Sequence, residues 1–222
     1  LFRDLYLTCF PPFLAKHIFK TSGTTGPRGI HRLQDTDAYN LGAQQTLQRF
    51  IGPVPQQGVS LVSPSFDSSL GHMCRLFAPR LTQCFIPDIG VLVEEAWDIL
   101  QTAQAPIFLP ATGFAIATLL QKDVPPCSLP DGSIIMITGG FKGRFTALDE
   151  QQMQQRLFQL FPTARIVGEY GMTELSSQLW SDQLGEPFQP PHWLRAFAVD
   201  PHTGDPIDGV GQLRPACGCA SA

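Results

Sequence analysis

Short apolar runs alternate along this chain with longer segments in which apolar residues recur every three or four positions. The short runs are typical of buried β-strands and lie at residues 59–62, 106–109, 133–137, 166–168 and 197–199. The longer segments predict helices over residues 36–50, 94–103 and 112–121, and another after residues 146–149. Strands that alternate with helices in this way predict an α/β fold with a mainly parallel β-sheet and flanking helices.

The apolar faces of two predicted helices are well defined. Asp35 or Thr36 can cap the first helix, whose buried face is predicted to hold Tyr39, Ala43, Leu47 and Phe50. A capping box at residues 146–149 precedes a helix whose buried stripe is predicted to be Met153, Leu157 and Leu160. In parallel sheets ligands bind beyond the carboxyl ends of the strands, so we expect the functional residues in the loops that follow the strands.

Composition narrows the class of protein. The 222 residues are 43% hydrophobic and 15% charged, enough for one large domain or two small ones. The net charge of −4 gives no reason to expect nucleic acid or an anionic membrane as a partner. No apolar run approaches the roughly 20 residues that a membrane-spanning helix needs, so no membrane span is expected.

The cysteines indicate a reducing environment. Six of them are dispersed without any Cys-x-x-Cys pair, which argues against a zinc site and against a disulfide scaffold. The first residues also lack the pattern of a signal peptide, and we therefore expect a cytoplasmic protein. The chain does not begin with Met, and its last residues lose all periodicity, so we expect a piece of a larger protein.

The first candidate binding segment is TSGTTGPRG, residues 21–29. Small residues let successive backbone N–H groups converge on an anion, hydroxyls add donors, and Arg28 adds a fixed positive charge. The pattern is neither a Walker loop nor a dinucleotide fingerprint. The residues expected at a bound phosphate are Thr21, Ser22, Gly23, Thr24, Thr25 and Gly26. A flexible turn is the alternative for a loop of this composition.

The second candidate is EYGMTE, residues 169–174, directly after an apolar run. Tyr170 can stack on a base, Thr173 can bond a phosphate oxygen, and the Glu174 carboxylate can hold Mg²⁺ when phosphate supplies the remaining ligands. The alternative is the start of a helix, with Thr173 as its cap.

Two weaker candidates complete the set. Gly139 and Gly140 follow the most apolar strand, where glycine permits close approach of a flat ligand, although a simple turn explains them equally well. Phe66 and His72 lie in the segment SFDSSLGH, residues 65–72, and are expected to line a substrate pocket. A lone histidine is more often a capped or surface residue.

In their order along the chain, these segments resemble motifs of the adenylate-forming superfamily, which contains acyl-CoA synthetases, peptide-synthetase adenylation domains and luciferases. The segment from Thr21 to Gly29 resembles its phosphate loop, and residues 170–174 resemble its Tyr-Gly-x-Thr-Glu motif. Phe66–Ser69 resembles the acyl-pocket motif, residues 138–140 the adenine-side loop, and residues 210–213 a later Gly-Glu-Leu segment. Within the superfamily the chain is most similar to acyl-protein synthetases, also called long-chain-fatty-acid–luciferin-component ligases, on residues 19–22, 139–143 and 168–175.

This resemblance implies a reaction and a set of partners. The family uses Mg-ATP to activate a carboxylic acid, here expected to be a fatty acid, and passes the acyl group to a thiol. The expected cofactors are ATP and Mg²⁺, the expected acceptor is a protein thiol or CoA, and an acyl reductase is a further expected partner. Two alternatives remain, an acyl-CoA ligase of the phenylacetate type and a non-catalytic nucleotide-binding remnant.

The resemblance also implies roles for single residues. Arg28, Thr173 and Glu174 would act in catalysis, with Glu174 also binding Mg²⁺. The nucleotide would contact residues 21–26, Gly139, Gly140, Tyr170 and Gly171, and the acid would contact Phe66 and His72. Arg28 stands where the family has lysine, and the loop is one residue shorter before its proline.

The resemblance divides the chain into two parts. Residues 1–214 correspond to part of an adenylation core, and residues 215–222 form an unpatterned tail. The family's mobile C-terminal lid with its catalytic lysine has no counterpart here, so the fragment alone is expected to turn over poorly or not at all.

Overall fold

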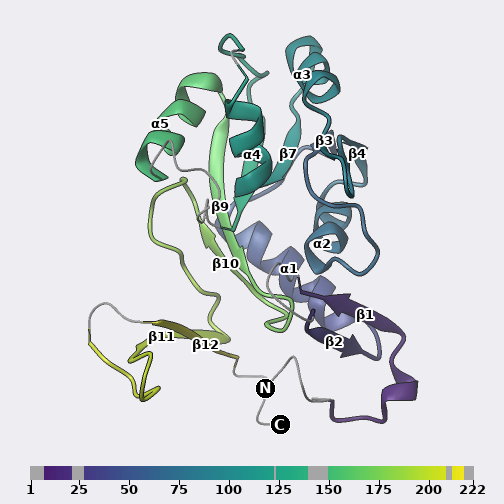
Figure 1. The fold of residues 1–222 in the computed structure, drawn as a ribbon, viewed down its shortest axis with the longest axis vertical. Helices are drawn as coiled ribbons and strands as arrows, with labels where there is room; N and C mark the ends of the chain where they lie inside the picture. The colour runs from purple at the N-terminus through teal and green to yellow at the C-terminus, as the bar shows by residue number, and fades with distance from the viewer. Residues whose placement is uncertain (1–7, 22–27, 123, 140–149, 209–211, 218–222) are drawn as a thin grey trace.

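The computed structural model describes residues 8–21, 28–122, 124–139, 150–208 and 212–217, the last of these as backbone only. Its main feature is one six-stranded sheet with the order β10-β9-β8-β7-β3-β4 (Figure 1). The strands are β3 (Gln57–Ser60), β4 (Arg80–Gln83), β7 (Phe108–Thr112), β8 (Ile134–Thr138), β9 (Arg165–Gly171) and β10 (Gln178–Ser181). All neighbours pair in parallel except β9 and β10, which form an antiparallel hairpin. The prediction of a mainly parallel α/β sheet is confirmed.

Two central strands, β7 and β8, end in register beside a polar residue of β9. Thr112 at the end of β7 pairs with Thr138 at the end of β8, and Thr138 pairs in turn with Glu169 in β9. Parallel strands place their carboxyl ends at one edge of the sheet, so this row of polar residues lies where a ligand is expected.

Helices cover both faces of the sheet. The helices α1 (Asp37–Phe50) and α2 (Ser69–Phe77) pack on the face that includes Ile134 and Met136 of β8. The opposite face, with Ile135 and Ile137, packs against α3 (Val93–Thr102), α4 (Gly113–Leu120) and α5 (Glu150–Leu160). Successive side chains of a strand point to opposite faces, and β8 is apolar on both because both faces are covered.

Most of the predicted helices are present with small shifts in their ends. The helix predicted from Thr36 begins at Asp37, and the stripe Met153, Leu157 and Leu160 is buried in α5 as expected. The capping box at residues 146–149 lies outside the described residues. Helix α2 was not predicted from the sequence, because it is short and contains a glycine. It begins where the Ser68 hydroxyl accepts a hydrogen bond from the Gly71 N–H, at 3.0 Å.

Three small hairpins lie outside the main sheet. They are β1 (His17–Lys20) with β2 (Ile30–Leu33), β5 (Phe85–Ile86) with β6 (Gly90–Val91), and β11 (Leu194–Val199) with β12 (Gln212–Cys217). A short 3₁₀ helix, η1 (Pro12–Leu14), precedes β1. The expected loss of pattern after residue 214 is wrong for the next three residues, because backbone pairing with β11 continues to Cys217. Within the described residues, no helix has both the length and the apolar character to cross a membrane.

Candidate functional site

A cavity of about 380 Å³ opens at the carboxyl ends of β3, β7, β8 and β9. Thr112, Thr138 and Gly171 line it at three of these strand ends, and residues from β1, α1 and α2 close its sides. Its walls run from partly exposed residues such as Lys20 and Thr173 to fully covered ones such as Glu169 and Gln178. The cavity therefore has an open mouth and a buried end at the edge of the sheet where the fold predicts a ligand.

The described ends of the glycine loop, Thr21 and Arg28, lie next to Lys20, which lines the cavity. The neck of the loop is closed by two hydrogen bonds, from the Thr21 N–H to the Gly29 carbonyl at 2.9 Å and from the Gly29 N–H to the Thr21 hydroxyl at 2.8 Å. The predicted phosphate contacts Ser22, Gly23, Thr24, Thr25 and Gly26 lie outside the described residues. The structure thus places the base of the loop, with Thr21, next to the cavity wall formed by Lys20.

Arg28 holds the neck of this loop together. Its Nε donates to the Thr21 carbonyl at 2.6 Å, one terminal nitrogen donates to the Lys20 carbonyl at 3.3 Å, and the other lies 3.2 Å from Asp67 Oδ2. Arg28 is not among the described residues that line the cavity, whereas Lys20 is. Arg28 therefore stabilises the loop neck through contacts with its own chain, and Lys20 is the cation that lines the mouth of the cavity. The sequence analysis did not single out Lys20 as a site residue.

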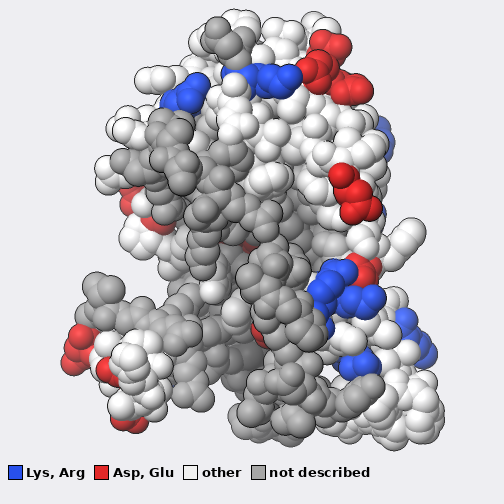
Figure 2. All heavy atoms as spheres, viewed as in Figure 1, with Lys and Arg blue, Asp and Glu red and all other residues white. Residues whose placement is uncertain are grey.

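Asp67 ties the loop to the segment before α2. Lys20 Nζ lies 3.2 Å from the same Asp67 Oδ2 that Arg28 contacts, and the Lys20 N–H donates to the Asp67 carbonyl at 2.8 Å. The Ser65 hydroxyl, 2.5 Å from Oδ1, is the largest cause that holds the pKa of Asp67 below its usual range, and Lys20 and Arg28 add to it. Figure 2 shows Lys and Arg side chains gathered over β1 and β2 beside an acidic one.

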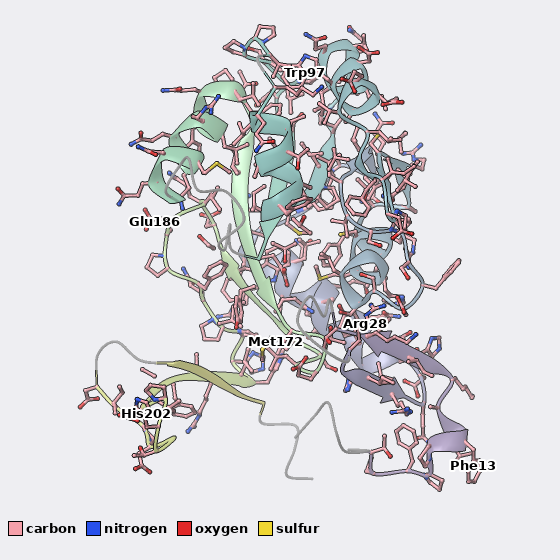
Figure 3. All side chains as sticks on the ribbon, in the orientation of Figure 1. Phe13, Arg28, Trp97, Met172, Glu186 and His202 are labelled. Carbon is pink, nitrogen blue, oxygen red and sulfur yellow. The ribbon has the colours of Figure 1, made fainter. Side chains whose placement is uncertain are left out.

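The second motif forms the turn of the β9–β10 hairpin. Thr173 and Glu174 lie in this turn, so the alternative of a helix start is wrong. Thr173 lines the cavity, and Glu174 is exposed beside it. Figure 3 shows the end of the hairpin, marked by Met172, near Arg28. The turn therefore brings the two motifs that were predicted to bind phosphate and Mg²⁺ to one end of the molecule.

His31 of β2 connects this turn to the glycine loop. Its Nε2 lies 3.2 Å from the hydroxyl of Ser176, a residue with the unusual φ of 48°. Burial lowers the pKa of His31, and the nearby Glu174 carboxylate partly offsets that effect. The sequence analysis missed His31, because only the tertiary fold brings β2 to the hairpin.

Tyr170, which was predicted to stack on a base, is not among the described residues that line the cavity. Its ring packs 6.1 Å from the ring of Phe188 and beside the small apolar cluster of Leu175, Leu179 and Leu194. Its neighbour Glu169 lines the cavity instead, since consecutive side chains in a strand point to opposite faces. Of the predicted nucleotide contacts, Gly139 and Gly171 line the cavity, and Gly140 lies outside the described residues.

Neither predicted pocket residue lines this cavity, but Phe66 lines a second one of about 230 Å³ beside α2. Phe66 is 92% exposed and stacks near the guanidinium of Arg75, at 5.8 Å. Its neighbour Asp67 is held by Lys20 and Arg28, which leaves Phe66 on the outer side of the loop. His72 Nε2 lies 2.7 Å from Asn40 Oδ1, and its ring packs 5.8 Å from that of Tyr39. His72 therefore supports the cavity wall through Tyr39, while burial lowers its pKa.

Glu169 is the most unusual group in the cavity. It is 3% exposed, and its Oε2 accepts a short hydrogen bond from the Thr138 hydroxyl. Burial raises the pKa of Glu169 to about 7, although the bond from Thr138 acts in the opposite direction. The sequence analysis gave this residue no role, yet a glutamate directly after Val167 and Gly168 in a buried strand was a signal that could have identified it.

Comparison with known proteins identifies the fold. No protein-family model matches the chain, and no curated protein does so at a significant level. Among solved structures, ATP-bound MatB from Rhodopseudomonas palustris is similar at TM-score 0.64 and 19% identity, over 90% of this chain and 39% of that one. The luciferase-like enzyme of the mealworm Zophobas morio is similar at TM-score 0.64 and 14% identity, over 97% and 51%.

A third similar structure is the O-succinylbenzoate Coenzyme A synthetase MenE from Bacillus subtilis, in complex with ATP and magnesium ion. It has a TM-score of 0.60 and 16% identity over 90% of this chain and 41% of that one. The chain has the fold of adenylate-forming enzymes. It spans about 40 to 50% of the length of these structures. In this adenylate-forming fold the cavity lies at the carboxyl edge of the parallel sheet, where the sequence analysis expected the site.

Glu169 predicts a pH dependence of stability. A carboxyl whose pKa is raised on folding binds its proton more tightly in the folded state, so it lowers the free energy of unfolding as pH rises from about 4.5 to 7. The loss is on the order of 3 kcal/mol. Glu169→Gln keeps the acceptor for Thr138 but carries no charge. At pH 8 we therefore expect the variant to have a larger free energy of unfolding than the wild type, measured by urea denaturation.

The control is Glu95→Gln, which changes an exposed carboxyl of α3. Its free energy of unfolding should match that of the wild type at every pH. The ionisable neighbours Tyr39 and Cys74 stay neutral in this range because burial raises both pKa values. If Glu169→Gln loses stability between pH 5 and 8 as steeply as the wild type, the assigned pKa is wrong.

Proposed function

We propose that this chain is the ATP-binding core of an enzyme that activates a carboxylic acid as an acyl-adenylate. The observation that carries this proposal is a single cavity at the strand ends, which the base of a phosphate-type loop, the Thr173–Glu174 turn and Gly139 all reach or border. The similarity of the fold to CoA-synthetase and luciferase-like structures supports it. ATP binds at the open mouth and the acid at the buried end.

The residues at the mouth suit the charges of this reaction. A carboxylate oxygen of the acid attacks the α-phosphorus of ATP, a new P–O bond forms, and pyrophosphate leaves with the electrons of the broken bond. Two anions must approach, and the Lys20 ammonium, loop N–H groups and a cation offset their repulsion. No nucleophile from the protein is needed, so positioning and electrostatics account for the rate.

Gly139 leaves room for a flat ligand beside β8. Its φ is +70°, a conformation that favours glycine, and a β-carbon there would meet no atom of the described residues within 4 Å. The open space lies at the end of a strand that is buried along its whole length. The adenine is therefore placed against this glycine in our proposal.

Glu174 and Thr173 fit a magnesium ion held mainly by phosphate. Mg²⁺ typically takes one or two carboxylates, and substrate phosphates and water supply its other ligands. No group of three or more His, Cys, Asp or Glu that could form a protein-only metal site occurs among the described residues. When bound, the ion would neutralise phosphate charge, and Glu174 would hold it near the Thr173 hydroxyl.

In the second step a thiol sulfur attacks the acyl carbon, the acyl–phosphate bond breaks, and AMP leaves. The finer prediction of an acyl-protein synthetase for a fatty acid rests on the sequence resemblance, and a CoA acceptor of the phenylacetate type is the alternative. Incubating the activated acid with CoA or with a cysteine-bearing carrier protein distinguishes the two acceptors by which thioester forms. If an aldehyde is released when an acyl reductase is added, the result supports the reductase as a partner.

A non-catalytic nucleotide-binding module is a second candidate. One observation favours it, because the Arg28 guanidinium is occupied by carbonyls of its own chain. ATP–pyrophosphate exchange on the full-length protein, with a panel of carboxylic acids, decides between the candidates. Acid-dependent exchange supports the enzyme, ATP binding without exchange supports the module, and failure to bind ATP refutes both.

Arg28 gives a test of the loop. Arg28→Ala should raise the KM for ATP about tenfold and that for the acid much less, because it loosens the loop neck without touching the buried end. Arg28→Lys keeps the charge but cannot make the same forked contacts, so it should lie in between. The measurement is exchange at varied ATP and varied acid. A larger effect on the acid would remove the loop from the nucleotide site.

A further inference from the structure

The buried end of the cavity presents two acceptor side chains from one hairpin. Glu169 of β9 and Gln178 of β10 are each 3% exposed, and both line the cavity. Gln178 pairs across the hairpin with Gly171. A β-carbon at Gly171 would lie 2.6 Å from Glu169 Oε1 and 3.8 Å from Gln178 Cγ. Both side chains therefore border the space that this glycine leaves free.

Within the described part of the chain, these two side chains receive a single donor, the Thr138 hydroxyl on Glu169. Gln178 Oε1 is buried without a hydrogen-bond partner among the residues that the structure describes. No ion pair joins Glu169 to a described lysine, arginine or histidine, and its described hydrogen bond comes from Thr138. A buried acceptor without a partner, and a buried carboxylate without a cation, both cost stability unless a ligand supplies what is missing.

Among the described hydrogen bonds of the neighbouring walls, the one that reaches either acceptor comes from the Thr138 hydroxyl. The Tyr39 hydroxyl already donates to the Ser69 carbonyl at 3.1 Å, and Val62 and Met73 are apolar. Lys20 lines the same cavity, but its ammonium pairs with Asp67 at the mouth. The buried end therefore offers hydrogen-bond acceptors and a carboxylate. The chain of a purely hydrocarbon acid has neither a donor nor a positive charge to match them.

We propose that the acid activated by this protein carries an amino group, bound as an ammonium ion between Glu169 and Gln178. The inference rests on the proposed function and names its substrate class, an amino acid. An ammonium has three N–H donors and a positive charge, so it can serve both acceptors and neutralise the carboxylate. A hydroxyl has one donor and no charge, and a fatty acid has neither.

This binding mode has a distinctive pH signature. An ammonium favours the ionised form of Glu169, whose pKa is otherwise raised by burial, so binding below pH 7 releases a proton. Tyr39 of α1 and Cys74 of α2, which lie near Glu169, have raised pKa values and stay neutral. The pKa of Tyr170, the strand neighbour on the other face, is raised as well. Affinity for the amino acid should rise about fivefold from pH 6 to pH 7, reach about tenfold by pH 8 and then level off. A deaminated acid should lack this rise.

The experiment is calorimetric titration of the protein with hexanoate, 6-hydroxyhexanoate and the aminohexanoates substituted at carbons 2 to 6. We expect one aminohexanoate to bind at least about tenfold tighter than hexanoate. Glu169→Gln and Gln178→Leu should each reduce that preference, and the exposed-site control Glu95→Gln should not. Glu169→Gln should also remove the pH dependence, an effect that a merely structural role would not produce.

The outcomes separate this inference from the proposed function, because binding needs no reaction. Hexanoate or the hydroxy acid binding as tightly as every aminohexanoate would overturn the amino-acid class, even with ATP–pyrophosphate exchange intact. Binding of no acid in the series would overturn it as well. Selective amino-acid binding without ATP-dependent exchange would support the ammonium site and refute the proposed adenylation.

Discussion

Glu174→Gln is expected to lower magnesium-dependent ATP–pyrophosphate exchange of the full-length enzyme by about 100-fold or more. The amide keeps the size of the side chain but loses the charge that would hold Mg²⁺ against the phosphates. Glu174 is exposed in the β9–β10 turn, so the change should leave the fold intact. Exchange is measured at saturating acid over a range of magnesium concentrations, and thermal unfolding checks the fold.

The matched control is Glu186→Gln, an exposed glutamate on a different loop, which Figure 3 shows well apart from the Met172 end of the hairpin. It should exchange at the wild-type rate. Normal exchange by Glu174→Gln would remove Glu174 from the magnesium site and would leave the motif a structural turn.

Gly58→Ala is expected to lower the free energy of unfolding by more than about 3 kcal/mol. Gly58 lies in β3 opposite Phe108 of β7, and its φ is +155°. A β-carbon there would lie 2.0 Å from the Phe108 carbonyl oxygen and 2.7 Å from its nitrogen. Both are backbone atoms inside the sheet, so relief of the contact requires that β3 and β7 separate.

Thermal or urea unfolding measures this effect, and Gly52→Ala is the matched control. Gly52 also has a positive φ, +88°, but a β-carbon there would meet nothing within 4 Å. Gly52→Ala should lower the free energy of unfolding only by the backbone strain, roughly 1 kcal/mol. Similar losses in the two variants would show that the close approach of β3 to β7 is not what requires glycine.

Periodicity was sufficient to predict the layers of this fold. Helices α1 and α5 bury the stripes that the spacing predicted, and β8 is buried along its whole length as an uninterrupted apolar run predicts. The hairpin of β1 and β2 was not predicted, because its four-residue strands are partly exposed and have no marked alternation. Such strands are specified by their pairing rather than by their own pattern.

The motifs indicated where the site lies more reliably than what each residue does there. Thr173 and Gly139 line the cavity, whereas Arg28, Tyr170, Phe66 and His72 do not appear among its described lining residues. Arg28 is occupied by carbonyls of its own loop neck, and Tyr170 faces away because its neighbour Glu169 faces in. Spacing along a chain cannot show which of two adjacent side chains points into a cavity.

The sequence by itself determined the α/β class, the parallel sheet and the edge of that sheet at which a ligand would bind. These follow from local apolar spacing and from the rule that parallel strands end together. Tertiary structure alone decided that Lys20 is the cation at the mouth and that Glu169 and Gln178 meet at the buried end. Those roles depend on contacts between distant segments, such as His31 with Ser176, 145 residues apart, because burial and partnering arise only when the chain has folded.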